Sequence, residues 1–365
     1  MKTILHLIDT TGPGGAETIF IDLATRLPKD EYRSIVVIRG KGWVYDELCR
    51  RGISPVLIDA KGSFNWRYLF RLCKLIKQEK VGLIQSHLLG SNVYSSLAGL
   101  LTRTPVVATF HGAVDVGDEE RFKWLKFMVI NSGSRSVVAV SDNLRRDLMA
   151  RTPIKQKKIK VIYNGISTAD FQRPHNNDIR KQFGWSNESV IIGSLGNIRT
   201  AKGYDILLRA AALLKNNATS FQFVIAGQGA GGLYDRLLEL RAELGLDETV
   251  HFFGFVDDPA AYLANLDFFL LSSTSEGFSI ATIQAMASKL PILATRSGGP
   301  EEIITHGENG WLIEVGNPQA MAEGIERLVT DKDLATTLAK KGNKHVMQTF
   351  DIGVMLSAYK ALYEI

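Results

Sequence analysis

The sequence predicts an α/β fold built from two Rossmann-like domains, each a parallel sheet covered by helices. Three observations predict it. Short apolar, β-branched runs alternate with helical patterns along the chain. The pattern starts again after a polar stretch at 170–189. A length of 365 residues is too large for one core of ordinary size and suits two domains.

The first half predicts seven strands and the helices between them. The runs are rich in Val and Ile, and the helical segments repeat apolar residues every three or four positions. The expected helices include 16–27 and 66–78, and the expected strands are 3–8, 34–39, 54–59, 81–87, 105–111, 136–141 and 159–166.

The second half repeats this order with six strands. Helices are expected at 203–215, 233–245 and 320–329. A last helix at 353–365 either completes the second domain or crosses back to the first. The expected strands are 190–196, 221–227, 250–255, 267–273, 291–295 and 310–314.

Composition excludes several classes of protein. The two cysteines, Cys49 and Cys73, have no CxxC or His-rich partner, so a thiolate metal site or a disulfide framework is not expected. The N-terminal apolar run is too short for a signal peptide, and no segment approaches the eighteen apolar residues of a membrane span. We expect a cytoplasmic protein, at most peripheral on the inner face of a membrane.

Charge is divided unevenly between the halves. Residues 1–160 hold 26 Lys and Arg against 15 Asp and Glu, and the remainder holds 17 against 23. The basic half suits an anionic partner, while a solvated surface with chance asymmetry explains it equally well. No nucleic-acid-binding module accompanies the basic residues, so we expect no nucleic-acid partner.

Glycines and cations follow several of the predicted strands. In two open α/β domains the ligand crevice is expected between the domains, at the carboxyl ends of the strands. Gly14 and Gly15 precede a helix whose N-terminus suits an anion, although a simple tight turn is as good a reading. Arg199 and Lys202 lie three residues apart and suit a diphosphate. Gly227 and Gly229 allow backbone to pass beneath a ligand.

The segment 272–287 brings a carboxylate to a helix start. Glu276 precedes the helix, Gly277 and Phe278 present backbone N–H groups, and Gln284 follows two turns inside. His87 and His111 end two first-half strands, and histidines at such ends act on substrate or serve the structure. No DxD-like acidic pair stands at a strand end, and no HExxH or Cys/His cluster is present, so we expect no metal and no cofactor.

Together these motifs resemble family 4 of the retaining glycosyltransferases, which have the GT-B architecture of two Rossmann-like domains facing across a cleft. The resemblance covers nearly the whole chain. It rests on the order of "GGAE" at 14–17, "TFHG" at 109–112, "VAVSDNLRRDL" at 138–148, "VIYNGI" at 161–166, "GNIRTAKGYDILLRA" at 196–210, "FVIAGQG" at 223–229, "SSTSEGFSIATIQAMASKLPILATRSGG" at 272–299 and "GENGWLIEVGN" at 307–317.

The resemblance implies domains at 1–168 for the acceptor and 169–345 for a nucleotide-sugar donor, with 346–365 crossing back to the first. Arg199 and Lys202 would neutralise the diphosphate without a metal, and Gly14 and Gly15 would close over the phosphates. His111 would lie under the transferred sugar. Glu276, with the N–H groups of Gly277, Phe278 and Ser279, would bind sugar hydroxyls and the phosphate edge. UDP is the expected nucleotide, by family frequency.

One position departs from the family pattern of Glu, seven residues, Glu. The second carboxylate of that pattern takes the ribose hydroxyls, and this chain has Gln284. An amide offers one acceptor oxygen and two donor hydrogens, so it can bind one hydroxyl as acceptor and the other as donor. Natural tolerance, an altered donor and a weakened enzyme are three open explanations.

Three functions follow as hypotheses. The first is a retaining transferase that acts on a glycan or lipid-linked acceptor in surface polysaccharide or glycoconjugate synthesis. The second is a non-catalytic homologue that binds a nucleotide sugar or partners an active enzyme, and the third is a nucleotide-sugar epimerase. Residues 121–136 mix Arg, Lys, Trp and Phe, which suits contact with an anionic membrane or an ordinary packed helix.

Overall fold

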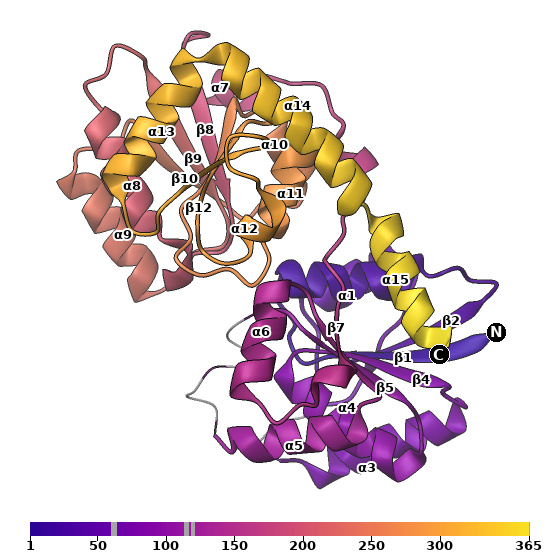
Figure 1. Cartoon of the computed structure of the whole chain (residues 1–365). Helices are drawn as coiled ribbons and strands as arrows, with labels where there is room; N and C mark the ends of the chain where they lie inside the picture. The colour runs from indigo at the N-terminus through magenta and orange to yellow at the C-terminus, as the bar shows by residue number, and fades with distance from the viewer. Residues whose placement is uncertain (60–63, 113–116, 118–120, 365) are drawn as a thin grey trace. The chain divides into compact units, whose positions relative to one another are not determined.

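The computed structural model describes residues 1–59, 64–112, 117 and 121–364 (Figure 1). These residues form two compact units. Unit 1 comprises Met1–Asn164 together with Gly353–Ile365, and unit 2 is Gly165–Ile352. The sequence had placed the first boundary at 168/169, a few residues further along the chain.

Unit 1 contains a parallel sheet of seven strands among its described residues, in the order β3-β2-β1-β4-β5-β6-β7. Each of the seven strands expected from the sequence is confirmed, with shorter bounds for five of them and slightly longer ones for β1 and β2. They are β1 (Lys2–Ile8), β2 (Tyr32–Ile38), β3 (Val56–Leu57), β4 (Leu83–His87), β5 (Val106–Phe110), β6 (Ser136–Ala139) and β7 (Ile159–Val161).

Helices cover both faces of this sheet, because both faces of its strands are apolar. One core packs Leu5, Leu7 and Ile84 against α3 (Trp66–Gln78) and α4 (Leu89–Thr102). The other packs Ile8, Val36 and Ile38 against α1 (Gly15–Arg26) and α2 (Trp43–Arg50). The unit is completed by α5 (Lys123–Gly133), α6 (Asp142–Arg151), the 3₁₀ helix η2 (Gln156–Lys158) and α15 (Ile352–Glu364).

The expected strand at 54–59 is reduced to the two residues of β3, which is the outermost strand of the sheet. It pairs only with β2 among the described strands. Val56 and Leu57 are 37% and 42% exposed. An edge strand gains hydrogen bonds on one side alone, so its ends are easily lost.

Unit 2 contains a parallel sheet of six strands among its described residues, in the order β10-β9-β8-β11-β12-β13. All six match expected runs. They are β8 (Val190–Leu195), β9 (Phe221–Ala226), β10 (Val250–Gly254), β11 (Phe268–Leu271), β12 (Ile292–Thr295) and β13 (Trp311–Ile313).

The helices of unit 2 again bury one apolar stripe each against the sheet. A large core joins β8, β9 and β11 to the neighbouring helices and includes the buried Phe223, Leu208 and Met321. The elements are η3 (Thr168–Phe171), α7 (Asp178–Phe183), η4 (Thr200–Lys202), α8 (Tyr204–Leu214), α9 (Gly232–Glu243), α10 (Pro259–Leu263), α11 (Ile280–Ala287), α12 (Pro300–Ile303), α13 (Pro318–Thr330) and α14 (Lys332–Thr349).

The last two helices belong to different units. Leu338 and Val346 of α14 are fully buried, and its Asn343 donates to the Met286 and Ala287 carbonyls of unit 2. In unit 1, Tyr359 and Tyr363 of α15 are 1% and 0% exposed. The chain therefore leaves unit 2 after Ile352, later than the 345/346 boundary expected from the sequence, because α14 stays packed in unit 2 to its end.

Each sheet has one point where its strand order reverses direction. In unit 1 it lies between β1 and β4, and in unit 2 between β8 and β11. The loops after such a pair of strands leave in opposite directions and open a crevice at the carboxyl edge, where open α/β sheets bind their ligands. In the described residues, no helix is both long and apolar enough to cross a bilayer.

Candidate functional site

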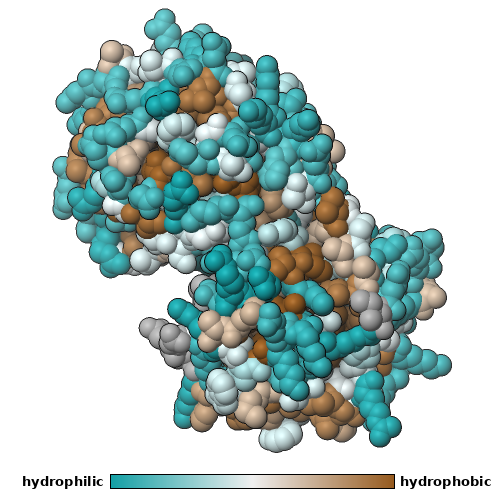
Figure 2. Space-filling model, viewed as in Figure 1, coloured by the Kyte–Doolittle hydropathy of each residue, from teal (hydrophilic) through white to brown (hydrophobic). Residues whose placement is uncertain are grey.

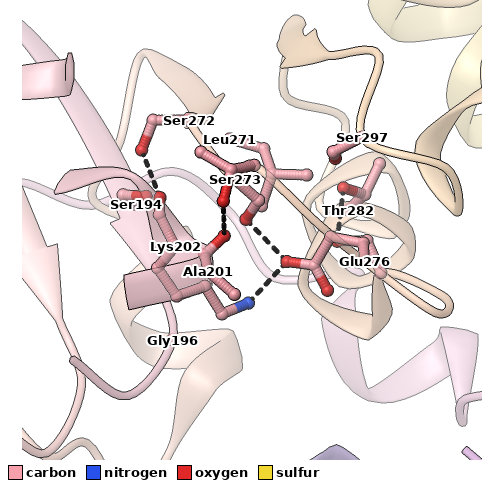
Figure 3. A network of polar contacts seen from close by, with 12 residues as sticks. Ser194, Gly196, Ala201, Lys202, Leu271, Ser272, Ser273, Glu276, Thr282 and Ser297 are labelled. Carbon is pink, nitrogen blue, oxygen red and sulfur yellow. Dashed lines mark hydrogen bonds and ion pairs between the residues drawn. The ribbon is translucent and has the colours of Figure 1, made fainter. Parts of the chain in front are cut away.

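The loops that follow β8 and β11 are joined by hydrogen bonds at the reversal point of unit 2 (Figure 3). Ser272 Oγ donates to the Lys202 carbonyl oxygen at 2.8 Å. The Thr274 N–H donates to the Ala201 carbonyl oxygen at 2.7 Å. These bonds hold η4, which carries Lys202, against the loop that carries Glu276.

Lys202 and Glu276 form an ion pair across these two loops (Figure 3). Lys202 Nζ lies 2.8 Å from Glu276 Oε1, and the side chains are 21% and 12% exposed. Ser273 Oγ donates to the same Oε1 at 2.6 Å. The second oxygen, Oε2, accepts no hydrogen bond from the residues that the structure describes. The carboxylate is therefore held at one oxygen and can accept at the other.

The backbone of Glu276 is also held from both sides. Its N–H donates to the Ser297 carbonyl oxygen at 2.8 Å, and its carbonyl accepts from the Gly299 N–H at 2.9 Å. A Cβ on Gly299 would lie 2.7 Å from Phe278 Cα, so only glycine allows this approach. The position of Glu276 is thus set by the β12 end as well as by its own loop.

Two glycines allow the loops of unit 2 to pass one another closely. Gly203 has φ +60°, and a Cβ there would lie 2.3 Å from the Ser272 carbonyl oxygen. Gly227 has φ +156°, and a Cβ there would lie 2.0 Å from the Gly196 carbonyl oxygen. Gly227 thus allows close approach to the backbone after β8. The expectation that it lies beneath a ligand stays a prediction.

The N-terminus of α11 carries backbone donors beside Glu276. The N–H groups of Gly277 and Ser279 donate to none of the described residues, and Ser279, the N-cap, makes no side-chain cap. Phe278 is 7% exposed and packs edge-on against Phe350. Backbone amides that lack an acceptor at a helix N-terminus favour an anion, as the sequence predicts for this segment.

Gln284 and Arg199 flank this arrangement. Gln284 is half-buried on the second turn of α11, and within the described part of the chain its amide makes no hydrogen bond. Arg199 is exposed at the start of η4 and forms no ion pair with a described residue. Both side chains are therefore available to a ligand at this edge of unit 2.

In unit 1, His111 and His87 form a pair at the ends of β5 and β4. His87 Nδ1 lies 2.8 Å from His111 Nε2, and the rings are stacked with centroids 5.1 Å apart. Burial lowers the pKa of His111 to about 3. Burial, together with His111 and His6, lowers the pKa of His87 well below its usual value. Both imidazoles are neutral at pH 7.

Gly14 and Gly15 open α1 as the sequence predicts. Gly14 is the N-cap in extended conformation, and its carbonyl accepts from the Thr18 N–H at 3.0 Å and from Thr18 Oγ1 at 2.9 Å. The helix therefore begins with Gly15 directly after the turn. Contact of these glycines with a phosphate stays a prediction.

Sequence reasoning overlooked Asp9. It follows β1 at the reversal point of unit 1, and burial raises the pKa of its carboxyl group. A Cβ on Gly90 would lie 2.1 Å from Asp9 Oδ2, so the start of α4 is fitted closely to this carboxylate. The sequence did contain an indication of Asp9, because an acidic residue directly after a buried first strand lies at the binding edge of an open sheet.

The site residues predicted from the sequence therefore fall into two groups, one in each unit. Glu276 and Lys202 are in direct contact, with Arg199, Gly227 and the α11 N-terminus on the same sheet edge. His111 contacts His87 in unit 1. No group of three or more His, Cys, Asp or Glu side chains that could hold a metal occurs among the described residues.

Two protein-family models match the chain. The model described as Glycosyltransferase Family 4 covers residues 13–170. The model described as Glycosyl transferases group 1 covers residues 175–345. The chain belongs to the family 4 glycosyltransferases. This family 4 glycosyltransferase has the GT-B fold, since both of its parallel-sheet units match glycosyltransferases of known structure.

Among its relatives is the capsular polysaccharide biosynthesis glycosyltransferase CapM of Staphylococcus aureus, 24% identical over 85% of this chain and 84% of CapM. A second is the N-acetylgalactosamine-N,N'-diacetylbacillosaminyl-diphospho-undecaprenol 4-alpha-N-acetylgalactosaminyltransferase of Campylobacter jejuni, 30% identical over 59% of this chain and 56% of the relative. The crystal structure of Anabaena HepE with UDP and glucose matches with a TM-score of 0.87 at 23% identity, covering 100% of both chains.

Proposed function

We propose that this chain is a retaining glycosyltransferase that moves a sugar from a nucleotide-sugar donor, a UDP-sugar, to a glycan or lipid-linked acceptor. The process would be the synthesis of a surface polysaccharide or another glycoconjugate. The observation that carries the proposal is the loop pair at the β8/β11 reversal point. There Lys202 and Glu276 lie 2.8 Å apart beside the α11 N-terminus.

These groups match the parts of a sugar diphosphate. Arg199, Lys202 and the free amides of Gly277 and Ser279 favour the diphosphate oxygens. Glu276, held at Oε1 and open at Oε2, favours the hydroxyls of the sugar, which are hydrogen-bond donors. One edge of unit 2 therefore offers donors to the anionic half of the ligand and an acceptor to the neutral half.

The mechanism that suits these groups is front-face displacement without a metal. The bond from the anomeric carbon to the diphosphate oxygen breaks, and the acceptor oxygen bonds to the same face of that carbon. The acceptor proton passes to the departing diphosphate. Lys202 and Arg199 stabilise the negative charge that grows on the leaving group, and positioning supplies the rest of the rate enhancement.

The relatives support the choice of donor and acceptor. HepE binds UDP and glucose, CapM acts in capsular polysaccharide biosynthesis, and the C. jejuni enzyme acts on a diphospho-undecaprenol-linked sugar. A UDP-sugar and a membrane-held acceptor are accordingly the first substrates to try with this chain.

Product analysis tests the proposal against its alternatives. Incubation with UDP-sugars and simple glycan or lipid-linked acceptors, read by mass spectrometry, should yield a glycosylated acceptor, and proton NMR should show the anomeric configuration of the donor. Gln284 favours the second candidate, a non-catalytic homologue, which would bind the donor and yield no product. Isomerised nucleotide sugar without transfer would instead identify an epimerase.

We further propose that unit 1 contacts an anionic membrane, through α3 rather than through residues 121–136. Trp66 and Phe70 of α3 are 73% and 72% exposed. With Arg67, Arg71 and Lys74 they line a groove of about 770 Å³ beside β3. None of these three cations pairs with a described carboxylate. Apolar rings between unpaired cations suit a lipid interface.

The stretch 121–136 is also partly exposed, since Trp124 and Leu125 of α5 are each 61% exposed. Apolar side chains, brown in Figure 2, reach the surface at the lower end of unit 1 in this view, where α3–α5 lie.

Sedimentation with phosphatidylglycerol vesicles distinguishes contact through α3 from contact through α5. Trp66→Ser with Phe70→Ser should abolish binding and Trp124→Ser with Leu125→Ser should preserve it. The opposite result would place the contact on α5, and binding unaffected by salt would refute an electrostatic contact.

A further inference from the structure

A chain of buried polar side chains connects the C-terminal helix α15 to His111 within unit 1. It begins at Tyr363, whose hydroxyl donates to Gln85 Oε1 at 3.1 Å. Gln85 Nε2 donates to Thr109 Oγ1 at 2.9 Å and lies 3.1 Å from His87 Nε2. His87 Nδ1 lies 2.8 Å from His111 Nε2.

Burial makes this chain costly unless every group is satisfied. Gln85, His87, Thr109 and Tyr363 are all fully buried or nearly so. Apolar side chains of similar volume would pack there without the desolvation penalty of an amide, an imidazole and two hydroxyls. A network that runs from Tyr363 through Gln85 and His87 to His111 Nε2 therefore indicates a role in setting the state of that imidazole.

The direction of the hydrogen bonds follows from the orientation of the Gln85 amide, whose Nε2 also faces the Ser86 carbonyl oxygen, an acceptor only, at 3.4 Å. The Tyr363 hydroxyl donates to the amide oxygen of Gln85, so the amide NH₂ of Gln85 faces Thr109 and His87. His87 Nε2 then accepts, and a neutral His87 carries its proton on Nδ1. This Nδ1–H donates to His111 Nε2, which leaves the proton of a neutral His111 on Nδ1.

We propose that Tyr363 is a positioning residue that acts through Gln85 and His87 to fix His111 in the tautomer protonated at Nδ1. In this tautomer His111 carries its proton on Nδ1 and accepts from His87 through Nε2. The importance of this tautomer for catalysis rests on the proposed function, in which His111 lies under the transferred sugar. The tautomer itself can be measured without any substrate.

The test is imidazole ¹⁵N NMR of the full chain labelled at histidine, with His87 and His111 assigned from His87→Asn and His111→Asn. In the wild type, both Nδ1 atoms should carry the proton and both Nε2 atoms should have the shift of an unprotonated nitrogen. In Tyr363→Phe the Gln85 amide loses its fixed orientation, so the two His111 shifts should move toward the average of the tautomers. In Gln85→Glu the acceptor-only side chain should reverse both tautomers.

Tyr359→Phe is the matched control, because it removes a buried hydroxyl from the same helix one turn earlier. Tyr359 contacts Thr109 at 3.3 Å and leaves the Tyr363–Gln85 bond in place, so its His111 shifts should equal those of the wild type. A wild-type His111 protonated at Nε2, or unchanged His111 shifts in Tyr363→Phe, would overturn the proposal. If Tyr363→Phe does not fold, Gln85→Glu decides, because an unreversed His111 tautomer in that variant would overturn the proposal as well.

Kinetics separates this inference from the proposed function. With an active donor, Tyr363→Phe should lower kcat by roughly 2–10-fold, the range expected for one neutral hydrogen bond, with the donor KM nearly unchanged. A tautomer shift in a chain that shows no transfer would support the inference and refute the transferase assignment. A loss of kcat without any change in the His111 shifts would refute the inference alone.

Discussion

Lys202 Nζ lies 2.8 Å from Glu276 Oε1, and this contact joins the loops that follow β8 and β11. The two residues are 74 positions apart in the chain. They meet because β8 and β11 are neighbours in the sheet while their helices leave in opposite directions. A cation and a carboxylate are thereby placed at the edge where an open sheet binds its ligand.

Loss of the cation should reduce catalysis strongly. Lys202→Gln removes the positive charge that would face the leaving diphosphate, which should raise the barrier by about 2–4 kcal/mol and lower kcat/KM by roughly 30–1,000-fold. Initial-rate kinetics measures this. Arg173→Gln is the control, because Arg173 forms an exposed ion pair with Asp258 in the same unit and its loss should change kcat/KM less than twofold. Equal effects of both substitutions would contradict the role of Lys202.

Placing a carboxylate at position 284, as in the family pattern, should strengthen binding of the nucleotide. In Gln284→Glu a charged acceptor faces the ribose hydroxyls, and hydrogen bonds to charged groups are stronger by about 1–2 kcal/mol, or roughly 5–30-fold in affinity. Calorimetric titration of UDP measures this. Gln319→Glu on α13 adds the same charge elsewhere in unit 2 and should leave the affinity unchanged. Weaker binding by Gln284→Glu would show that the amide is adapted to its ligand.

Replacing a closely packed glycine by alanine should destabilise unit 2. Gly227→Ala places a Cβ 2.0 Å from the Gly196 carbonyl oxygen, and overpacking of this kind costs about 1–3 kcal/mol or more. Gly307→Ala is the control, because Gly307 also has positive φ, +76°, but open space around its Cβ position. The difference in unfolding temperature between the two variants therefore measures the contact alone. No difference would mean that the loops can separate without cost.

Acid should destabilise unit 1 through its buried histidines. Burial lowers the pKa of His6 and of His111 to about 3, whereas an unfolded histidine titrates near 6.5. Between these values the unfolded chain binds protons that the folded chain does not, so the free energy of unfolding falls as pH falls from about 6.5 toward 3. Each histidine contributes up to about 1.4 kcal/mol per pH unit.

Denaturant unfolding between pH 5 and 7 checks this prediction. The mean slope of the unfolding free energy over this range should decrease by about 1 kcal/mol per pH unit in His6→Gln, because one titrating imidazole is removed. His6 is fully buried, so the comparison must use variants that remain folded at pH 7. An equal slope in the wild type and in His6→Gln would show that the imidazole is protonated in the folded protein.

The fold could be predicted because the apolar pattern of each segment matches the burial of that segment in the folded protein. Strands such as β5 and β12 have every residue buried, and their sequences are continuous apolar or β-branched runs that few other structures accommodate. The prediction was weakest at β3, where edge placement left only Val56–Leu57 paired. The length of an edge strand depends on its neighbour, and the sequence of the strand alone does not contain that information.

The site could be predicted in part. Glu276, Lys202 and Gly227 stand at strand ends in recognisable motifs, and the structure places them on one sheet edge. The link from Tyr363 through Gln85 to His87 could not be predicted, because it joins side chains 278 positions apart whose contact depends on where α15 packs. Asp9 was overlooked for a different reason, since it belongs to no motif and is marked only by following β1.

Calorimetric titration of UDP, GDP and ADP into the wild-type chain and into Lys202→Gln tests the central claim most directly. The account predicts micromolar binding of UDP, weaker binding of GDP and ADP, and a loss of at least tenfold in UDP affinity for Lys202→Gln. Titration of Gln284→Glu shows whether position 284 limits the affinity. If none of the three nucleotides binds either the wild type or Gln284→Glu, the β8/β11 edge of unit 2 is not a nucleotide-sugar site and the proposed function is wrong.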